Sequence, residues 1–256
     1  MCFDEDSHPP IPPIAGAAVD GKRITLRTAD GTDFAAFAAQ PAQPNGGGMI
    51  ILPDVRGLFT FYEELALRFA EAGIGALAID YFGRTAGTAP REAGFDYNPH
   101  LSQVMWQGLR ADIVAARRLI GGWAGVRGVF SVGFCFGGRL SMLLASEDEL
   151  AMAGDIGFYG WPTGEARGGV PAPIDRVSAN ASPILAIFGG ADQGINAQVV
   201  ESYRAALAGA GAPHEVITYK DAPHSFFDRK ADEFAADSAD AWKRALDFVR
   251  ANTPAP

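Results

Sequence analysis

The chain has 256 residues, of which 48% are hydrophobic and 20% are charged, and its formal net charge is −9. Such a composition excludes an intrinsically disordered chain and provides enough apolar material for a large core. The acidic charge, without any basic run, argues against a nucleic-acid partner or a membrane surface. Because there is neither a membrane-length apolar stretch nor a basic N-terminus, we expect a cytoplasmic protein, as a monomer or small homo-oligomer.

Residues 1–18 are rich in proline and predict an irregular N-terminal arm, which precedes a single domain over residues 19–256. Two β-rich runs, residues 23–27 and 34–37, flank an Asp30-Gly31 turn. This pattern predicts a hairpin at the edge of a sheet.

From residue 49 onwards, short apolar runs alternate with segments of helical periodicity. The apolar runs predict buried strands over residues 49–52, 74–79, 126–132, 156–159, 184–188 and 216–219. The periodic segments predict helices over residues 61–72, 103–120, 136–146, 196–208 and 233–250. This alternation predicts an α/β fold with a mostly parallel central sheet and helices on both faces. Two long connections, residues 82–99 and 160–181, are expected to rim a pocket beyond the carboxyl ends of the strands.

One motif is typical of nucleophilic catalysis. The segment Gly133-Phe134-Cys135-Phe136-Gly137 follows a predicted strand and opens a predicted helix. A nucleophile on such a sharp turn needs small residues two positions away on either side, because larger side chains would collide. The N-terminus of the helix also stabilises a thiolate. The alternative is a buried structural cysteine at a glycine-rich strand end.

An acid and a histidine follow two later strands, in the order that this type of active site requires. Asp192 comes after the strand at 184–188 and His224 after the strand at 216–219. Asp221 is a competing acid, but its position three residues before the histidine favours a turn residue. We therefore predict a Cys135–His224–Asp192 triad.

These residues resemble the dienelactone hydrolase family, a branch of the α/β-hydrolases with a cysteine nucleophile. The resemblance extends from about residue 24 to the C-terminal helix and rests on residues 52–58, 80–84, 133–138, 189–192 and 224–226. It implies the α/β-hydrolase fold and hydrolysis of a dienelactone to an open-chain keto acid such as maleylacetate, through a cysteinyl acyl-enzyme. The backbone N–H groups of Val55 and Phe136 would form the oxyanion hole.

The resemblance also implies roles for charged residues, with two departures from the family pattern. Asp54 stands where the family has a glutamate that contacts the resting thiol, and it is a candidate for the same role. Arg84 matches the first of two arginines that hold the substrate carboxylate. The second would fall at Asp228, so Arg229 is the nearest candidate.

Five aromatic residues are candidates for the pocket wall, and Tyr81 is also a candidate for substrate binding; the five are Tyr81, Phe82, Trp106, Tyr159 and Trp161. No His/Cys/Asp cluster has metal-ligand spacing, and no phosphate or dinucleotide motif occurs, so we expect neither a metal nor a cofactor. With Cys2 as the second of only two cysteines, a disulfide framework is not expected.

Three alternatives to dienelactone hydrolysis remain open. The same triad fits a broader carboxylesterase or thioesterase. A hydrolase-fold protein that binds a small molecule without turnover would not need all three triad residues. A redox switch at Cys135 would need a resolving cysteine, and only Cys2 is available.

Overall fold

The computed structural model describes residues 7–14, 17, 19–91, 94–165 and 167–256. Its strands are β1 (Val19–Arg27), β2 (Asp33–Pro41), β3 (Gly47–Leu52), β4 (Gly75–Ile79), β5 (Gly128–Phe134), β6 (Gly154–Phe158), β7 (Ile184–Gly189) and β8 (His214–Tyr219). Its α-helices are α1 (Thr60–Glu71), α2 (Gly83–Ala86), α3 (Asn98–Leu101), α4 (Trp106–Gly121), α5 (Phe136–Leu144), α6 (Ala197–Ala210) and α7 (Ala235–Asn252). Of the predicted N-terminal arm, residues 7–14 carry no helix or strand, whereas Cys2 lies outside the described residues.

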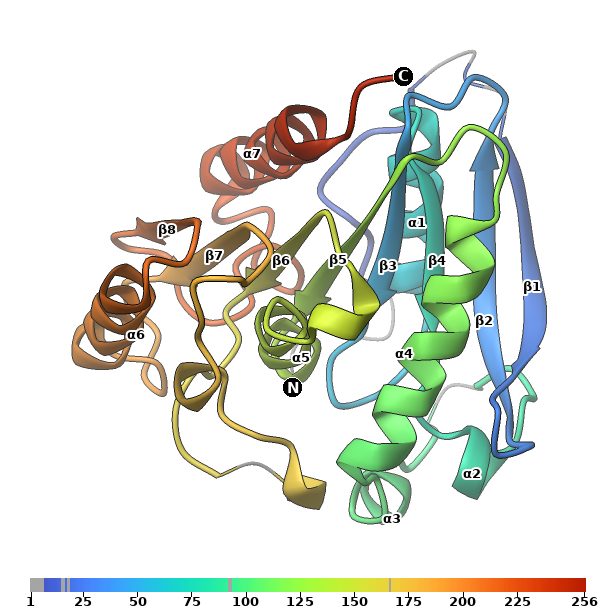
Figure 1. Ribbon diagram of the computed structural model, residues 1–256, viewed down its shortest axis with the longest axis horizontal. Helices are drawn as coiled ribbons and strands as arrows, with labels where there is room; N and C mark the ends of the chain where they lie inside the picture. Colours follow the sequence, from blue (N-terminus) through green and yellow to red (C-terminus); the bar gives the residue numbers. More distant parts are fainter. Residues whose placement is uncertain (1–6, 15–16, 18, 92–93, 166) are drawn as a thin grey trace.

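The strands form one eight-stranded sheet in the order β1-β2-β4-β3-β5-β6-β7-β8 (Figure 1). The six strands from β4 to β8 along this order pair in parallel. The hairpin of β1 and β2 joins them through an antiparallel pairing of β2 with β4. The mostly parallel sheet and the edge hairpin are thus confirmed.

Helices cover both faces of this sheet, as the apolar strands require (Figure 1). Successive side chains of β3 alternate between the two cores. Met49 and Ile51 pack with the apolar sides of α1 and α7, whereas Ile50 and Leu52 pack with those of α4 and α5. β3 therefore contributes to both cores.

The long connection after β4 is more ordered than the sequence indicates. It contains the one-turn helices α2 and α3, and α4 begins at Trp106 instead of near residue 103. A single helical turn has too few residues to show a periodic pattern, so these helices could not be found from the sequence.

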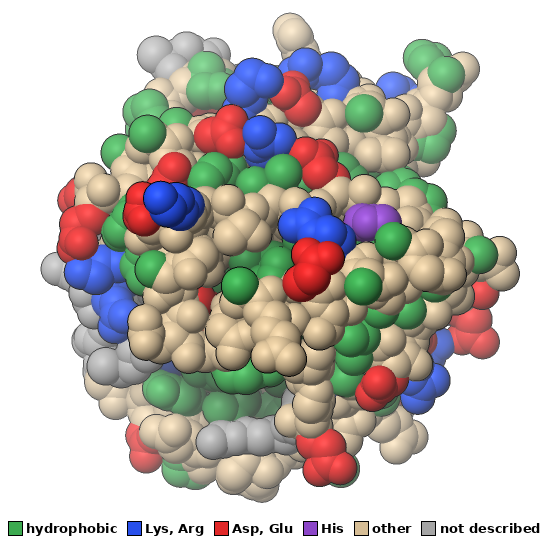
Figure 2. All heavy atoms as spheres, turned by 90° about the vertical axis from the view of Figure 1, so that its left-hand side faces the viewer, with side chains coloured by type: hydrophobic (Ala, Val, Ile, Leu, Met, Phe, Trp, Pro, Cys, Tyr) green, Lys and Arg blue, Asp and Glu red, His purple; other side chains and the backbone are tan. Residues whose placement is uncertain are grey.

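The surface viewed from the side of α6, α7 and β8 mixes acidic and basic side chains (Figure 2). Several cations in this region pair with acids: Arg244 contacts both Asp240 and Glu215, and Lys243 contacts Asp247. In the part of the chain that the structure describes, no helix combines the length and the hydropathy that a membrane span needs.

Candidate active site

Cys135 lies on a strained turn between β5 and α5. Its backbone has φ 54° and ψ −109°, a conformation that residues with a side chain rarely adopt. The turn is possible because Gly133 has no side chain: a Cβ atom there would collide with the carbonyl oxygen of Gly137. The Cys135 N–H donates to the Phe158 carbonyl at 3.0 Å, which fixes the turn against β6. The glycine spacing in the sequence therefore has the predicted steric cause.

Asp192 and His224 meet at the carboxyl ends of β7 and β8. The Nδ1 atom of His224 lies 2.6 Å from Oδ2 of Asp192. The other oxygen, Oδ1, accepts the backbone N–H groups of Gly194 and Ile195 at 2.8 and 3.0 Å. Burial raises the pKa of Asp192, but the hydrogen bonds from His224 and from these amides outweigh it and hold the pKa below its usual value. An ionised Asp192 fixes the orientation of the imidazole. The competing acid, Asp221, is exposed.

Cys135 and His224 line one cleft of about 620 Å³. Its wall is mainly apolar and aromatic and comes from both long connections that were expected to rim a pocket. The other lining residues are Val55, Tyr97, Asn98, Leu101, Phe136, Arg139, Tyr159, Trp161, Thr163, Gly164, Glu165 and Ile195. The cleft thus contains the predicted nucleophile, the predicted base and both residues predicted to supply oxyanion N–H groups.

Asp54 is completely buried in the loop between β3 and α1. Its carboxylate accepts the backbone N–H of Arg56 at 2.8 Å, and the Arg56 guanidinium lies 3.5 Å from its second oxygen. Its own N–H donates to the hydroxyl of Tyr62 at 2.9 Å. The carboxylate therefore has a cationic partner in the same loop, and contact with the thiol stays a prediction.

Asp228, at the position of the expected second arginine, is a buried acid behind His224. The Tyr159 hydroxyl donates to Asp228 at 2.7 Å, and the Tyr159 ring lies 4.9 Å from the imidazole of His224. The N–H of Arg229 donates to the other oxygen of Asp228. Burial raises the pKa of Asp228 to about 8, and the negative charge of Asp54 acts in the same direction. Asp228 therefore holds the Tyr159 ring, which in turn lies against the imidazole of His224.

Arg84 is placed outside the cleft. Its guanidinium binds both oxygens of Asp112, at 2.7 and 2.8 Å, and Asp30 at 3.0 Å. It lines a separate pocket of about 290 Å³, together with Tyr81. The hydroxyl of Tyr81 donates to the Pro53 carbonyl at 2.8 Å. Two acids thus hold Arg84, so the structure does not bring the expected carboxylate-binding arginine to the nucleophile.

Sequence reasoning gave no role to Arg139, which lies within the cleft wall. Among the cleft-lining residues that the structure describes, Arg139 is the one arginine or lysine. Its guanidinium donates to four backbone carbonyls, those of Trp161, Thr163, Gly164 and Val170. Arg139 therefore fixes the connection after β6 against the cleft. Arg139 directly follows the Gly137-Gly138 pair of the nucleophile motif, and this position could have indicated that it lies near the site.

The remaining candidates divide between the cleft and other places. Of the five aromatic residues, Tyr159 and Trp161 line the cleft, and Tyr81 lines the pocket of Arg84. Phe82 is completely buried, and Trp106 packs against the hydrophobic core beside α4 and α5. Arg229 is exposed. Within the described ranges, no group of three or more His, Cys, Asp or Glu residues is arranged to hold a metal ion.

Comparison with known proteins assigns the chain to one family over most of its length. The family model described as "Dienelactone hydrolase family" matches residues 34–253. A protein of Escherichia coli K12 named "Putative carboxymethylenebutenolidase" is 29% identical over 236 residues, which are 89% of this chain and 86% of the relative. A carboxymethylenebutenolidase of Rhodococcus opacus is 27% identical over 97% of this chain and 96% of its own length. The crystal structure of a "Putative Dienelactone Hydrolase" from Klebsiella pneumoniae superposes with a TM-score of 0.78 at 24% identity, covering 91% of this chain and 99% of that one.

Proposed function

The chain belongs to the dienelactone hydrolase family, an ester and lactone hydrolase family, and we propose that it acts through a covalent acyl intermediate on Cys135. The observation that carries the proposal is the placement of Cys135 and His224 in one cleft, with Asp192 hydrogen-bonded to the histidine. A protein that only binds a ligand needs neither the strained turn nor the oriented imidazole.

Acylation begins with transfer of the Cys135 thiol proton to His224. Because Nδ1 of His224 is bound to Asp192, Nε2 is the nitrogen that exchanges protons with the thiol. The thiolate attacks the carbonyl carbon of the ester or lactone, and the carbonyl oxygen becomes an oxyanion. The N–H groups of Val55 and Phe136 are the proposed donors to that oxyanion. Collapse of the intermediate breaks the carbon–oxygen bond, and the leaving oxygen takes the proton from His224.

Deacylation repeats these steps with water as the nucleophile. His224 removes a proton from the water, the resulting hydroxide attacks the thioester, and the Cys135 thiolate leaves and regains the proton. A lactone keeps its leaving oxygen within the acyl chain, so the product is a single open-chain acid. An enol lactone yields an enol that tautomerises to a keto acid, which is the reaction that the family resemblance implies.

The charges around the cleft favour an uncharged substrate over a carboxylate-bearing dienelactone. Arg84 is bound to two acids, Arg229 is exposed, and the guanidinium of Arg139 already donates to four carbonyls. Glu165 adds a negative charge to the wall. At Arg84, a substrate carboxylate would have to displace one of the two acids. This arrangement supports the broader carboxylesterase as the second candidate function, with the same mechanism.

The deciding experiment measures kcat/KM for cis-dienelactone, for its uncharged methyl ester and for an aryl acetate. We expect Cys135→Ala to lower every measurable rate at least ~1000-fold, since the nucleophile is lost. Cys2→Ala is the matched control and should leave the rates unchanged. We expect the methyl ester to exceed the free acid.

Three results would contradict the proposal or part of it. Full activity of Cys135→Ala would refute the mechanism. A dienelactone rate well above that of its methyl ester would refute the preference for an uncharged substrate. It would show that a cation in the cleft binds the substrate carboxylate. A burst of released aryl alcohol without a thioester adduct on Cys135 after quenching with acid would exclude the covalent intermediate on this residue.

A further inference from the structure

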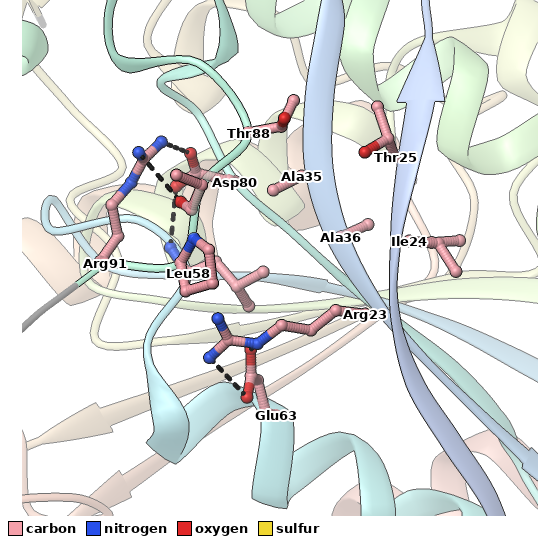
Figure 3. A pocket seen from close by; sticks show the side chains of 12 residues that line it. Arg23, Ile24, Thr25, Ala35, Ala36, Leu58, Glu63, Asp80, Thr88 and Arg91 are labelled. Atoms are coloured by element: carbon pink, nitrogen blue, oxygen red, sulfur yellow. Dashed lines mark hydrogen bonds and ion pairs between the residues drawn. The ribbon is translucent and has the colours of Figure 1, made fainter.

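Asp80 follows β4 directly and lines a small cavity of about 210 Å³ that is separate from the catalytic cleft (Figure 3). The residues of two ion pairs line this cavity: Asp80 with Arg91, and Glu63 with Arg23. The Asp80 side chain is completely buried, and the Arg91 side chain is 5% exposed. A carboxylate and a guanidinium so far from water are retained together only if their geometry and hydrogen bonds compensate for lost hydration.

Asp80 holds the loop that carries a proposed oxyanion donor. The N–H of Leu58 donates to Oδ1 of Asp80 at 3.0 Å, as Figure 3 shows. Gly57 has φ 79°, and a Cβ atom there would collide with the same oxygen, so the loop lies directly on the carboxylate. Val55 belongs to this 53–59 loop and lines the catalytic cleft beside Cys135.

The second oxygen of Asp80 joins the 53–59 loop to the connection after β4. It accepts the N–H of Phe82 at 3.3 Å and an N–H of the Arg91 guanidinium. Arg91 also donates to the carbonyls of Ala86, Gly87 and Ala89. One buried carboxylate thus binds the 53–59 loop, the end of β4 and the turn after α2.

Arg91 connects this anchor to a second segment that lines the catalytic cleft. Its guanidinium lies 4.9 Å from the centre of the Phe95 ring, and Phe95 stacks on His100 at 5.1 Å. The next residue, Leu101, lines the cleft, as do Tyr97 and Asn98. The Asp80–Arg91 pair therefore contacts both the loop that carries Val55 and, at Phe95, the segment that leads to residues 97–101.

We propose that Asp80 and Arg91 are positioning residues for the oxyanion hole. They hold the Val55 N–H where it can donate to the oxyanion that forms in the Cys135 reaction. The inference rests on the proposed function, because it assigns its effect to the oxyanion of the Cys135 reaction. Loss of Arg91 leaves Asp80 without its cation, and the carboxylate then moves or takes up a proton. Either change frees the 53–59 loop. Since removal of one oxyanion donor lowers kcat by about 100- to 1000-fold, a displaced donor should lower it by roughly 10-fold or more.

The test separates a displaced oxyanion donor from general damage to the site. Arg91→Met keeps an unbranched apolar chain against Phe95 and removes the charge. We measure kcat and KM for an aryl acetate, and in parallel the rate at which iodoacetamide alkylates Cys135. Alkylation needs the thiolate but forms no oxyanion. We expect kcat to fall at least ~10-fold, with KM and the alkylation rate within about twofold of the wild type.

Arg23→Met is the matched control, because it removes the other ion pair of the same cavity. Arg23 binds Glu63 on α1 at 2.7 Å, and both line the cavity of Figure 3. We expect wild-type kcat in this variant. Arg91→Lys is the second variant if Arg91→Met does not fold: the amine keeps a charge beside Asp80 but cannot span Asp80 and three carbonyls, so kcat should fall a few-fold with normal alkylation.

Wild-type kcat in folded Arg91→Met or in Arg91→Lys overturns the inference, as does a parallel loss of hydrolysis and alkylation. An equal loss in Arg23→Met also overturns it, because the effect would then belong to the cavity as a whole. These outcomes differ from failure of the proposed function, in which Cys135→Ala itself retains the hydrolytic rate.

Discussion

The two sides of the catalytic cleft are held in different ways. On the triad side, Cys135, Asp192 and His224 follow β5, β7 and β8, and the turns are fixed by backbone contacts and by the bond between Asp192 and His224. On the loop side, position depends on buried charges from separate segments, such as Asp80 with Arg91. The positions of the triad residues are therefore encoded by short sequence segments that contain glycines. The position of the loop depends on ion pairs that form only when the chain has folded.

The largest effect should come from breaking the triad side at Asp192. In Asp192→Asn the amide oxygen replaces Oδ1 as acceptor for Gly194 and Ile195, so the NH₂ group faces His224. The imidazole must then accept at Nδ1 and carry its proton on Nε2, which is the wrong tautomer for a base. We expect kcat to fall by about 100- to 10,000-fold with an unchanged melting temperature.

Asp221→Asn is the control for this prediction, because Asp221 is an exposed acid in the turn that leads to His224. Its kcat should equal that of the wild type. A loss in Asp221→Asn comparable to that in Asp192→Asn would show that the acid of the triad is misassigned.

On the loop side, Arg84→Met should change stability more than catalysis. Asp112 is 1% exposed and would lose the guanidinium that binds both its oxygens. Burial raises the pKa of Asp112 to about 6 although Arg84 opposes this, so the acid becomes protonated more readily without Arg84. We expect the free energy of unfolding to fall by about 2 kcal/mol, less than for a fully buried pair because Arg84 is partly exposed.

The same variant also tests whether Arg84 binds substrate. Denaturant unfolding measures the stability, and kcat/KM for an uncharged ester should stay within about twofold of the wild type. An unchanged stability together with a raised KM for dienelactone would show that Arg84 binds the substrate and does not stabilise the fold through Asp112.

The smallest effect concerns a buried acid in the sheet beneath the triad side. Asp155 on β6 accepts the hydroxyls of Ser131 and Ser182, both at 2.5 Å. Burial raises its pKa from 3.8 to about 7, against the effect of these two hydrogen bonds. The folded protein therefore binds the proton more tightly than the unfolded chain. The stabilisation is complete below about pH 4, falls as the pH rises towards 7, and is gone above that.

Asp155→Asn should remove this contribution to the pH dependence, because the amide stays neutral and the two hydroxyls can reorient towards it. Melting temperatures at pH 5 and pH 8 measure it. We expect the difference between the two to be smaller in the variant by a few degrees. An unchanged difference would mean that Asp155 is already ionised at pH 5 in the folded protein.

The sequence could predict that Cys135, Asp192 and His224 follow strands of the parallel part of the sheet, because the signals for these positions are local. A nucleophile between Gly133 and Gly137, with an acid and a histidine after later apolar runs, follows from steric limits on a tight turn and from the common direction of parallel strands. The edge hairpin and the six parallel strands were predictable for the same reason, since each has its own apolar pattern and turn residues.

The partners of the arginines could not be predicted in this way. Arg84 pairs with Asp112, 28 positions further along the chain, and nothing in either segment indicates the other. Nothing in the sequence around Asp228 indicates that this residue is buried near His224, or that the Tyr159 hydroxyl donates to it.

The sequence by itself thus determined the fold class and the choice of Cys135, Asp192 and His224 as the proposed nucleophile, acid and base, because these depend on local geometry and on strand order. Only the tertiary structure decided which cations reach the cleft, because a charged side chain takes whichever opposite charge or carbonyl lies nearest once the chain is packed. Arg139 therefore lies in the cleft wall, Arg84 lies outside it, and Arg91 and Asp80 are joined behind the loop that carries Val55.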